Sequence, residues 1–555
     1  MPTPRLLECV PNFSEGRDLA KIALITAEIE TVEGVQLLNV DPGRATNRTV
    51  VTLVGEPEAV VEAAFRAIRK AAEIIDMRHH TGEHPRMGAT DVCPLVPISG
   101  IPMEEAARFA RQLGERVGRE LGISGYFYEE AATRPERRNL SHIRAGEYEG
   151  MEAKMRLPEW APDFGPATFN AGAGATVIGA RDFLVAYNIN LNTTSTRRAN
   201  AIAFDLRESG RSTKNPDGTT TTQPGLLKSV KGIGWYIEEY GIAQVSLNLT
   251  NIRDTPVHVA FDTAVKAADA RGIRVTGSEL VGLVPLNALL DAGRYFLEKQ
   301  QRSVGVSEAE LVKIAVRSLG LDELAPFDPQ ERVIEYKLRQ NDTAATRLVS
   351  MSLTALADET ASESPAPGGG SIAAAVGALG AALGTMVANL SAHKRGWDDR
   401  WAFFSDHAAH GQRRKDALLA LVDADTAAFN RIMAGFGLPN KTDGEKAARK
   451  AAIQEATKGA IETPLRVMEE SLASFDVIEA MVEHGQPSSV TDAGVGAACA
   501  RTAVLGAALN VQVNVADLED AAFKADALAR AARMLAEAEE REKAVLAKVR
   551  AKLGV

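Results

Sequence analysis

The strongest constraint on the fold is a change in the apolar pattern near residue 330. Before it, short β-branched runs alternate with helical patterns, and residues 50–71 share the order strand, turn, proline and apolar helix with residues 245–268. After it, the chain is rich in alanine, poor in proline and periodic at about 3.6 residues. We predict an α/β (α+β) N-terminal half made of two ferredoxin-like βαββαβ subdomains, followed by an all-α helical domain.

These patterns divide the chain of 555 residues, which is too long for one ordinary core. We expect subdomains at 1–180 and 181–330, a linker at 331–350 and a helical domain at 351–555. In the first subdomain we predict strands at 6–12, 35–40, 48–54 and 124–129, helices at 18–31 and 56–75, and a turn at 41–43. In the second we predict strands at 182–191, 233–238, 243–249 and 273–283, and helices at 197–208 and 255–270.

The helical domain contains one segment that must be weighed against a membrane span. Residues 371–390 carry no charge and are long enough to cross a bilayer. Half of them are alanine and glycine, which favours a buried helix of a soluble domain, so no membrane span is expected. Further helices are predicted at 416–435, 442–472, 490–513 and 521–553, with turns at 437–443 and 484–489.

Charge and cysteine content exclude some classes of function. The formal charge of −10 argues against a general nucleic-acid binder, which needs an excess of Lys and Arg. Cys9, Cys93 and Cys499 are widely separated, so a disulfide framework and a thiolate zinc site are not expected. The N-terminus lacks the features of a signal peptide. A cytoplasmic location is therefore expected.

A cluster of histidines is the first candidate for chemistry. His79, His80 and His84 fall within six residues, and Gly82 and Pro85 make a regular helix improbable there. Histidine exchanges protons readily near neutral pH, which favours proton transfer. A capping or surface role remains open, and so does metal binding, although the spacing of His80 and His84 chelates zinc only on a helix.

A glycine-rich stretch at 159–175 is the second candidate, because glycines allow the backbone to approach a ligand closely. It lacks the GxGxxG register of a dinucleotide site. Glycine content alone favours an ordinary loop between subdomains.

Two further motifs lie in the helical domain. PAPGGGS at 365–371 precedes a helix and could bind an anion, but a flexible lead-in with Ser371 as the helix N-cap is favoured. LVDADTAAF at 421–429 places Asp423 and Asp425 within an apolar helical pattern. Positions two apart point to different helix faces, so one acid can be solvated while the other faces a cleft with a raised pKa. Two solvated acids are an equally good interpretation.

These motifs together resemble the formimidoyltransferase-cyclodeaminase family. ECVPNFSEG, TNRTV, GEHPRMGATDVCP, RAGEYEG, EWAPDFGP and GLVP resemble its transferase half, and PAPGGGS and LVDADTAAF resemble its cyclodeaminase half. The resemblance runs from about Leu6 to the C-terminus. It implies transfer of the formimidoyl group from N-formimidoyl-L-glutamate to N5 of tetrahydrofolate, followed by cyclisation to 5,10-methenyltetrahydrofolate with release of ammonia. These are steps of histidine degradation and one-carbon metabolism.

The resemblance also implies roles for individual residues. His84 corresponds to the catalytic histidine of the transferase, and Asp425 to the catalytic aspartate of the cyclodeaminase. No metal is expected. Tetrahydrofolate, which can carry a polyglutamate tail, is expected to contact two segments. Their residues are Gly165, Pro166, Ala167, Thr168, Phe169, Asn170, Ala171, Gly172, Ala173 and Gly174, and Gly225, Leu226 and Leu227.

The chain departs from the family pattern in two places. Ala173 stands where a tryptophan is expected, which implies a less aromatic face in the folate pocket. Residues 211–222 form an enlarged loop that is either a lid or a longer connection. Alternatives to the main interpretation are a transferase whose helical half serves only for assembly, and a metal-dependent hydrolase built on the histidine cluster. A homo-oligomer that associates through both domains is expected.

Overall fold

The computed structural model describes residues 5–44, 46–82, 84–215, 217, 219–341 and 347–555. They form two compact units, one of residues Met1–Leu289 and Leu319–Asn341 and the other of Leu290–Ser318 and Asp342–Val555. The first unit holds the mixed sheets and the second is helical, which confirms the predicted fold class.

The first sheet has seven strands and begins with a ferredoxin-like core. Strand β4 pairs with β3 on one side and with β1 and β2 on the other, and both β1 and β2 pair antiparallel with β5. Two more strands extend this core, because β7 pairs parallel with β5, and β6 pairs parallel with β7. The strands are β1 (Leu6–Cys9), β2 (Asn12–Phe13), β3 (Val35–Gly43), β4 (Arg48–Gly55), β5 (Thr90–Ser99), β6 (Ser124–Glu129) and β7 (Ala175–Ala180).

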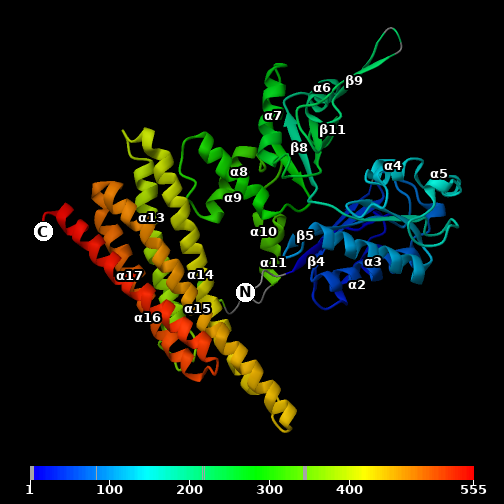
Figure 1. Ribbon diagram of the computed structural model, residues 1–555. Coiled ribbons are helices and arrows are strands. Elements are labelled where there is room, and N and C mark those ends of the chain that lie inside the picture. Colours follow the sequence, from blue (N-terminus) through cyan, green and yellow to red (C-terminus); the bar gives the residue numbers. More distant parts are fainter. Residues whose placement is uncertain (1–4, 45, 83, 216, 218, 342–346) are drawn as a thin grey trace. The chain divides into compact units, whose positions relative to one another are not determined.

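Helices cover both faces of this sheet (Figure 1). One face packs against α1 (Leu19–Glu30), α2 (Pro57–Ile74) and α3 (Met103–Leu121), and the other against α4 (Leu140–Arg144) and α5 (Glu147–Met155). Helix α1 agrees with the predicted helix 18–31, and its N-cap and buried face explain this agreement. Asp18 accepts hydrogen bonds from the amides of Ala20 and Lys21 as its N-cap, and Ile22, Ile25 and Ile29 form its buried face.

Two strand predictions need correction in detail. Residues 6–12 form two strands rather than one, because Pro11 has no amide hydrogen to donate to the sheet. The turn predicted at 41–43 is wrong, since β3 continues to Gly43 and pairs there with Arg48. Proline is tolerated at position 42 because β3 is an edge strand. Strands β5 and β7 and helices α3, α4 and α5 were not predicted.

The second sheet has the order β11-β12-β8-β13, which is that of a βαββαβ ferredoxin-like unit. All its pairings are antiparallel. The enlarged loop 211–222 contains a hairpin that projects from this sheet (Figure 1), while residues 216 and 218 lie outside the described part. The elements are β8 (Val185–Leu191), α6 (Thr196–Leu206), β9 (Arg211–Lys214), β10 (Thr220–Gln223), β11 (Val230–Ile237), β12 (Ile242–Leu249), α7 (Val257–Asp269) and β13 (Val275–Val281).

Shorter helices follow this sheet. They are α8 (Leu286–Lys299), α9 (Glu308–Leu319), α10 (Pro329–Arg332), α11 (Ile334–Asn341) and α12 (Leu353–Thr360). The segment Leu290–Ser318 belongs to the helical unit. There the amide of Val304 donates to Oγ of Ser405 at 3.1 Å, and Asn389 donates to the carbonyl of Gly305 at 2.8 Å.

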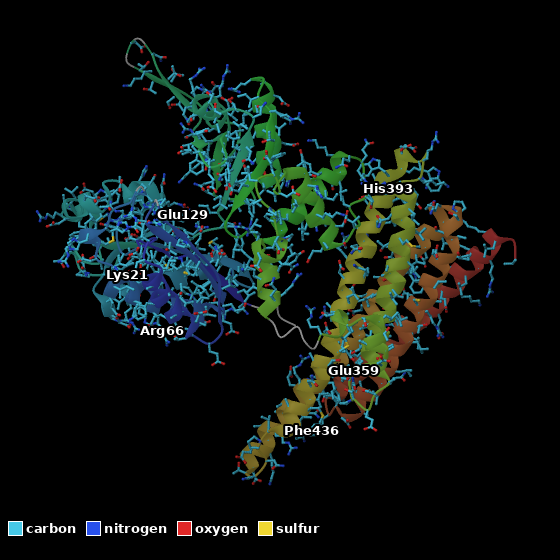
Figure 2. The ribbon with its side chains drawn as sticks, turned by 180° about the vertical axis from the view of Figure 1, so that it is seen from behind. Lys21, Arg66, Glu129, Glu359, His393 and Phe436 are labelled. Atoms are coloured by element: carbon cyan, nitrogen blue, oxygen red, sulfur yellow. The ribbon has the colours of Figure 1, made fainter. Side chains whose placement is uncertain are left out.

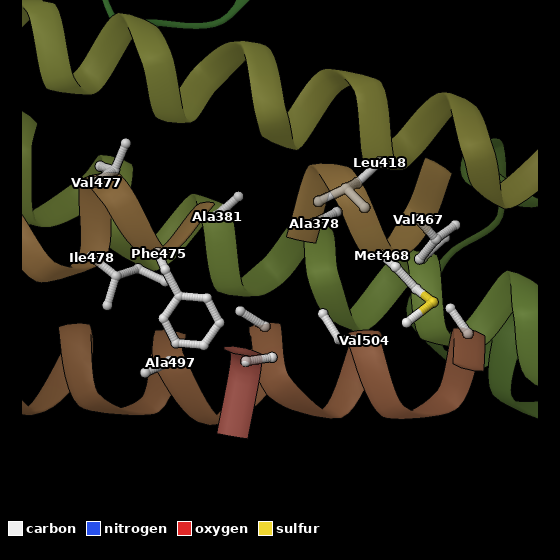
Figure 3. Close-up of a cluster of buried hydrophobic side chains, with 14 of the residues drawn as sticks. Ala378, Ala381, Leu418, Val467, Met468, Phe475, Val477, Ile478, Ala497 and Val504 are labelled. Atoms are coloured by element: carbon white, nitrogen blue, oxygen red, sulfur yellow. The ribbon is translucent and has the colours of Figure 1, made fainter. Parts of the chain in front are cut away.

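Five long helices build the helical unit. They are α13 (Gly369–Ala392), α14 (Trp401–Gly437), α15 (Asp443–His484), α16 (Val490–Asn514) and α17 (Ala521–Leu553). Small side chains of α13, such as Ala378 and Ala381, let it pack closely against larger ones, such as Phe475 and Ile478 of α15 (Figure 3). Helices α14 and α15 extend as a hairpin, with Phe436 near its end (Figure 2).

Helix α13 is the charge-free segment whose burial was predicted from the sequence. Within the described residues, α13 and the stretch Pro487–Asp517 are long and apolar enough to cross a membrane by length and composition. Of the most apolar window, 61% is buried in α13 and 50% in the second stretch. Core helices of soluble proteins pass the same test, and α13 packs against α14, α15 and α16.

Candidate functional site

The strand directions bring several of the predicted motifs to one edge of the first sheet. Because β2 runs antiparallel to both β4 and β5, β4 and β5 run in the same direction and begin at the same edge. Strand β7 runs parallel to β5 and also begins there. The histidine cluster precedes β5 and the glycine-rich stretch precedes β7, so both lie at this edge.

Backbone hydrogen bonds fasten the histidine loop to the glycine-rich loop. Gly88 and Gly174 form an isolated bridge, the amide of Ala89 donates to the carbonyl of Ala173 at 2.8 Å, and the amide of Ala175 donates to Met87 at 3.0 Å. Gly174 has a φ of +69°, and a Cβ there would lie 2.3 Å from the Met87 carbonyl. Only glycine therefore fits at this crossing.

His84 is half-buried and uses both ring nitrogens. Its Nδ1 lies 2.7 Å from the carbonyl oxygen of Pro85, and its Nε2 lies 2.8 Å from Nη1 of Arg48. A carbonyl can only accept and a guanidinium can only donate. His84 is therefore a neutral imidazole that donates from Nδ1 and carries its lone pair on Nε2.

The surroundings of His84 oppose its protonation. Burial, then the positive charges of Arg48 and Arg144, lower its pKa to about 4. Arg144 donates to Oδ2 of the fully buried Asp91 at 2.6 Å, and the amide of Met87 donates to Oδ1 at 3.0 Å. Burial raises the pKa of Asp91, although Arg144 and Arg48 both oppose this rise.

His80 and His79 differ from His84. His80 donates from Nε2 to the Asn47 carbonyl at 2.8 Å and accepts from Nε of Arg86 at 3.3 Å, so it has the opposite tautomer and both nitrogens are engaged. Burial lowers its pKa. The side chain of His79 is 83% exposed. Among the three, His84 is the one whose Nε2 carries the lone pair and faces Arg48.

A cavity of about 490 Å³ opens beside this loop and is lined by Thr81, Gly82, Arg86, Gly146, Glu147 and Glu149. Arg86 is 8% exposed and donates to Glu149 at 2.6 and 2.9 Å. The cavity is polar and large enough for part of a small ligand.

The glycine-rich stretch has an exposed part and a buried part. Residues 165–168 are exposed, and so is Ala171, whose carbonyl accepts from the Tyr148 hydroxyl at 2.6 Å. The ring of Phe169 lies 5.4 Å from that of Tyr148. Ala173 is only 5% exposed and Gly174 is buried. The backbone of Ala173 and Gly174 forms the contacts with Ala89 and Gly88 that join the two loops.

The second predicted folate segment lies beside the second sheet. The amides of Leu226 and Leu227 donate to the carbonyls of Asp205 and Leu206 at 2.8 and 3.0 Å. Leu226 is 67% exposed, whereas Leu227 is buried. These contacts hold the segment at the end of α6.

In the helical unit the structure brings the two predicted motifs together. A Cβ on Gly370, in the first turn of α13, would lie 2.3 Å from Oδ1 of Asp425 on α14. Ser371 lies 3.0 Å from both Oδ2 of Asp425 and the carbonyl of Val422, and it is fully buried. The N-cap of α13 is Gly368, so the prediction of Ser371 as the N-cap was wrong.

The two acids of LVDAD face different neighbours. Burial raises the pKa of Asp425, although Ser371 opposes the rise through hydrogen bonds. Asp423 instead accepts the amide of Leu348 at 2.7 Å and lies 3.4 Å from Arg347. Asp423 therefore anchors the short 3-10 helix Leu348–Ser350, and Asp425 faces the start of α13.

The sequence reasoning assigned no role to Arg48, Arg144, Asn12 or Asp91, which surround His84. Nη2 of Arg48 also contacts Oδ1 of Asn12. The signal available was that all four lie inside the quoted motifs, which are ECVPNFSEG, TNRTV, RAGEYEG and GEHPRMGATDVCP. Across the described ranges, no group of three His, Cys, Asp or Glu side chains is placed to hold a metal ion.

Comparison with known proteins covers the whole chain. A family described as "Formiminotransferase domain, N-terminal subdomain" matches residues 6–181, "Formiminotransferase domain" matches 186–339, and "Formiminotransferase-cyclodeaminase" matches 352–533.

Curated relatives match as well. The formimidoyltransferase-cyclodeaminase of Rattus norvegicus is 43% identical over 99% of both chains. The glutamate formimidoyltransferase of Streptococcus pyogenes is 43% identical over 53% of this chain and 94% of its own. The methenyltetrahydrofolate cyclohydrolase of Methylorubrum extorquens is 39% identical over 33% of this chain and 87% of its own. The chain therefore belongs to the formimidoyltransferase-cyclodeaminase family.

Proposed function

We propose that this chain is a bifunctional, folate-dependent enzyme of histidine degradation. It transfers the formimidoyl group from N-formimidoyl-L-glutamate to N5 of tetrahydrofolate, and then forms 5,10-methenyltetrahydrofolate with release of ammonia. The observation that carries this proposal is the geometry of the two candidate sites, a neutral His84 whose Nε2 carries the lone pair and a buried Asp425 held against the first turn of α13. The relative from Rattus norvegicus, alike over 99% of both chains, supports the presence of both activities.

In the transferase step, N5 bonds to the formimidoyl carbon and loses its proton. The bond from this carbon to the glutamate nitrogen breaks, and that nitrogen gains a proton. His84 performs both transfers, because its Nε2 lone pair can accept the first proton and return it to the leaving amine. The exposed backbone of Gly165, Pro166 and Thr168, close to the same sheet edge, supports a folate contact there.

The remaining proposed folate contacts have different exposure. Leu226 is exposed in the second segment and is able to contact a ligand. Ala173, Gly174 and Leu227 are buried in this structure, so their contribution is to shape the loops. Replacement of a tryptophan by Ala173 then changes the packing beneath the loop.

In the cyclodeaminase step, the formimidoyl group reacts in its protonated amidinium form, N5–CH=NH2+. N10 bonds to its carbon and loses its proton, while the terminal nitrogen, which is then an amino group, gains a proton and leaves as ammonia. Asp425 acts as the acid for the departing nitrogen, and its carboxylate then takes the proton from N10. A raised pKa keeps a larger share of this carboxyl protonated before the reaction.

The test supplies formimidoylglutamate and tetrahydrofolate to the full-length protein. Methenyltetrahydrofolate is followed by its absorbance, and glutamate and ammonia are assayed separately. We expect all three products in equal amounts. Glutamate without ammonia would favour the alternative in which the helical half serves only for assembly. The metal-dependent hydrolase finds little support, because both nitrogens of His80 and of His84 are engaged in hydrogen bonds.

We further propose the cytoplasm as its location and a homo-oligomer that associates through both domains. Large apolar side chains on the surface of the helical unit support association, including Leu379, Val495 and Leu509, which are 55–61% exposed. We propose domains at 1–180, 181–330 and 351–555 with a linker at 331–350. The family matches support three domains with limits near 180 and 351, but the second match extends to residue 339, into the proposed linker. The grouping of Leu290–Ser318 with the helical unit favours a different division.

A further inference from the structure

The atom of His84 that must accept a proton is already occupied. Nη1 of Arg48 donates to Nε2 at 2.8 Å, and Nδ1 is held by the Pro85 carbonyl. A base whose lone pair receives a hydrogen bond from a cation cannot take a proton until that donor moves. In the described structure, therefore, the lone pair on Nε2 of His84 is not available to accept a proton.

The charges around His84 are not balanced. Arg48 and Arg144 both face it, and Asp91 is the acid that faces them. Tyr128 also faces Arg48 but is neutral, since burial raises its pKa to about 12. Among the residues that the structure describes, two guanidinium groups and one carboxylate meet at His84, so these groups together carry an excess of positive charge.

The two guanidinium groups also have unused donors. The Nε atoms of Arg48 and Arg144 are buried and have no hydrogen-bond partner among the described residues. Arg144 donates one hydrogen bond to Asp91 through Nη2. Arg48 donates to His84 through Nη1 and to Asn12 through Nη2. A planar guanidinium binds a carboxylate with two parallel hydrogen bonds, more strongly than it binds a neutral imidazole.

We propose that Arg48 and Arg144 form a receptor for a carboxylate group of the substrates, and that the bound carboxylate draws Arg48 away from Nε2 and so frees His84 to act as a base. This inference rests on the proposed transferase activity. Arg48 is then a positioning residue that acts on the reaction through His84. The carboxylate belongs either to formimidoylglutamate or to the glutamate tail of folate, since both present the same group.

The inference links substrate binding to the proton affinity of His84. In the free enzyme the pKa of His84 is about 4, because of burial and of the two arginines. A carboxylate nearby adds negative charge and removes the donor from Nε2, and both changes favour the imidazolium. We expect the midpoint of the His84 titration to rise by about one to three pH units when an anion binds.

The test follows His84 by NMR in the full-length protein labelled with ¹³C and ¹⁵N histidine. The His84→Ala variant identifies its signal among the nine histidines. L-Glutamate is added in one series and p-aminobenzoyl-L-glutamate in the other. A rise of the midpoint with the first assigns the carboxylate to formimidoylglutamate, and a rise with the second assigns it to folate. If neither compound moves the midpoint, the inference is overturned.

An arginine variant provides a second test. Arg48→Gln should raise the midpoint of His84 in the free enzyme, abolish the response to the anion, and raise the KM for the substrate that supplies it. Arg78→Gln is the control, because Arg78 lies on the loop that carries His84 but is 61% exposed and pairs with Asp76. An anion response that survives in Arg48→Gln contradicts the inference.

Failure of the proposed function has a different signature. In that case the wild-type protein forms no glutamate from formimidoylglutamate, while the NMR titration still reports whether an anion shifts His84. If transfer proceeds normally and His84 does not respond to either anion, only the receptor is rejected.

Discussion

The two proposed sites handle protons in contrasting surroundings. His84 lies on a loop at the edge of a β-sheet, between two arginines and close to a buried aspartate. Asp425 lies on a long helix against the first turn of another helix, with Ser371 as its hydrogen-bond partner. The first site is rich in charge, whereas the second has almost none.

Burial favours the uncharged form in both sites, with opposite chemical results. It lowers the pKa of His84 and raises the pKa of Asp425. An uncharged histidine is a base and an uncharged aspartic acid is an acid. One physical effect therefore suits His84 to the proposed role of a base and Asp425 to the proposed role of an acid.

Removing the base should separate the two sites most clearly. We expect His84→Ala to slow formimidoyl transfer by about a hundredfold to ten-thousandfold, because it removes the imidazole whose lone pair lies on Nε2 beside Arg48. Cyclisation of supplied 5-formimidoyltetrahydrofolate should be unchanged. His79→Ala is the control, since that side chain is exposed. Equal losses in both reactions would show that the sites are not independent.

Removing the acid should give the reciprocal result. We expect Asp425→Asn to release glutamate normally, accumulate 5-formimidoyltetrahydrofolate and form ammonia about a hundredfold to ten-thousandfold more slowly. Asp423→Asn should keep cyclisation and lose at most about 1 kcal/mol of stability, because it removes the charge that pairs with Arg347 but keeps an oxygen that can accept the Leu348 amide. If Asp423→Asn blocks ammonia release and Asp425→Asn does not, the acid has been assigned to the wrong residue.

A methyl group placed against the acid gives a smaller effect. In Gly370→Ala the new Cβ would lie 2.3 Å from Oδ1 of Asp425 and must displace the carboxyl. We expect cyclisation to fall on the order of tenfold to a hundredfold, measured as ammonia release, with transfer unchanged. In Gly369→Ala the nearest atom is Nδ2 of Asn510 at 3.6 Å, an ordinary contact, so this variant should behave like the wild type.

Glu8 tests the effect of burial at a place where no chemistry is proposed. Burial raises its pKa to about 7, with Arg181 opposing the rise and Glu335 adding to it. The folded protein then keeps a proton that the unfolded chain releases above pH 4.5, so Glu8 costs stability as the pH rises through 7.

We therefore expect Glu8→Gln to gain thermal stability relative to the wild type between pH 5 and pH 8, by a few degrees in the unfolding midpoint. The exposed Glu33→Gln variant should show no such trend. A difference between Glu8→Gln and the wild type that is constant with pH would mean that burial does not set the charge of Glu8.

Much of the fold could be predicted, because the apolar pattern within a single segment indicates whether that segment forms a helix or a strand. Helix α17 spans residues 521–553 as predicted, and β6 spans 124–129. Strand β7 was not predicted, because Ala175–Ala180 follows a glycine-rich stretch that reads as a loop. Its partners β5 and β6 come from distant parts of the chain, and such long-range pairing overrides local sequence preference.

The site could be predicted as a set of motifs but not as a geometry. The pairing of PAPGGGS with LVDAD depends on the contact between α13 and α14, which no spacing in the sequence encodes. The place of Arg48 at Nε2 of His84 likewise follows from the common direction of β4 and β5. The types of the side chains in the motifs indicated proton transfer. Which side chains contact one another depends on the strand topology and the helix packing, which the sequence does not show directly.

The crossing of Gly88 and Gly174 also dictates when the transferase site can form. The residues of the histidine loop are synthesised early, but they are fastened only when β7 pairs with β5. Pairing between distant segments is slow, because the entropy of closing a long loop is lost before the contacts stabilise it. In a nascent chain the first strands and α2 can therefore fold well before the histidine loop is fastened, so this part of the proposed transferase site is completed late in the folding of the subdomain.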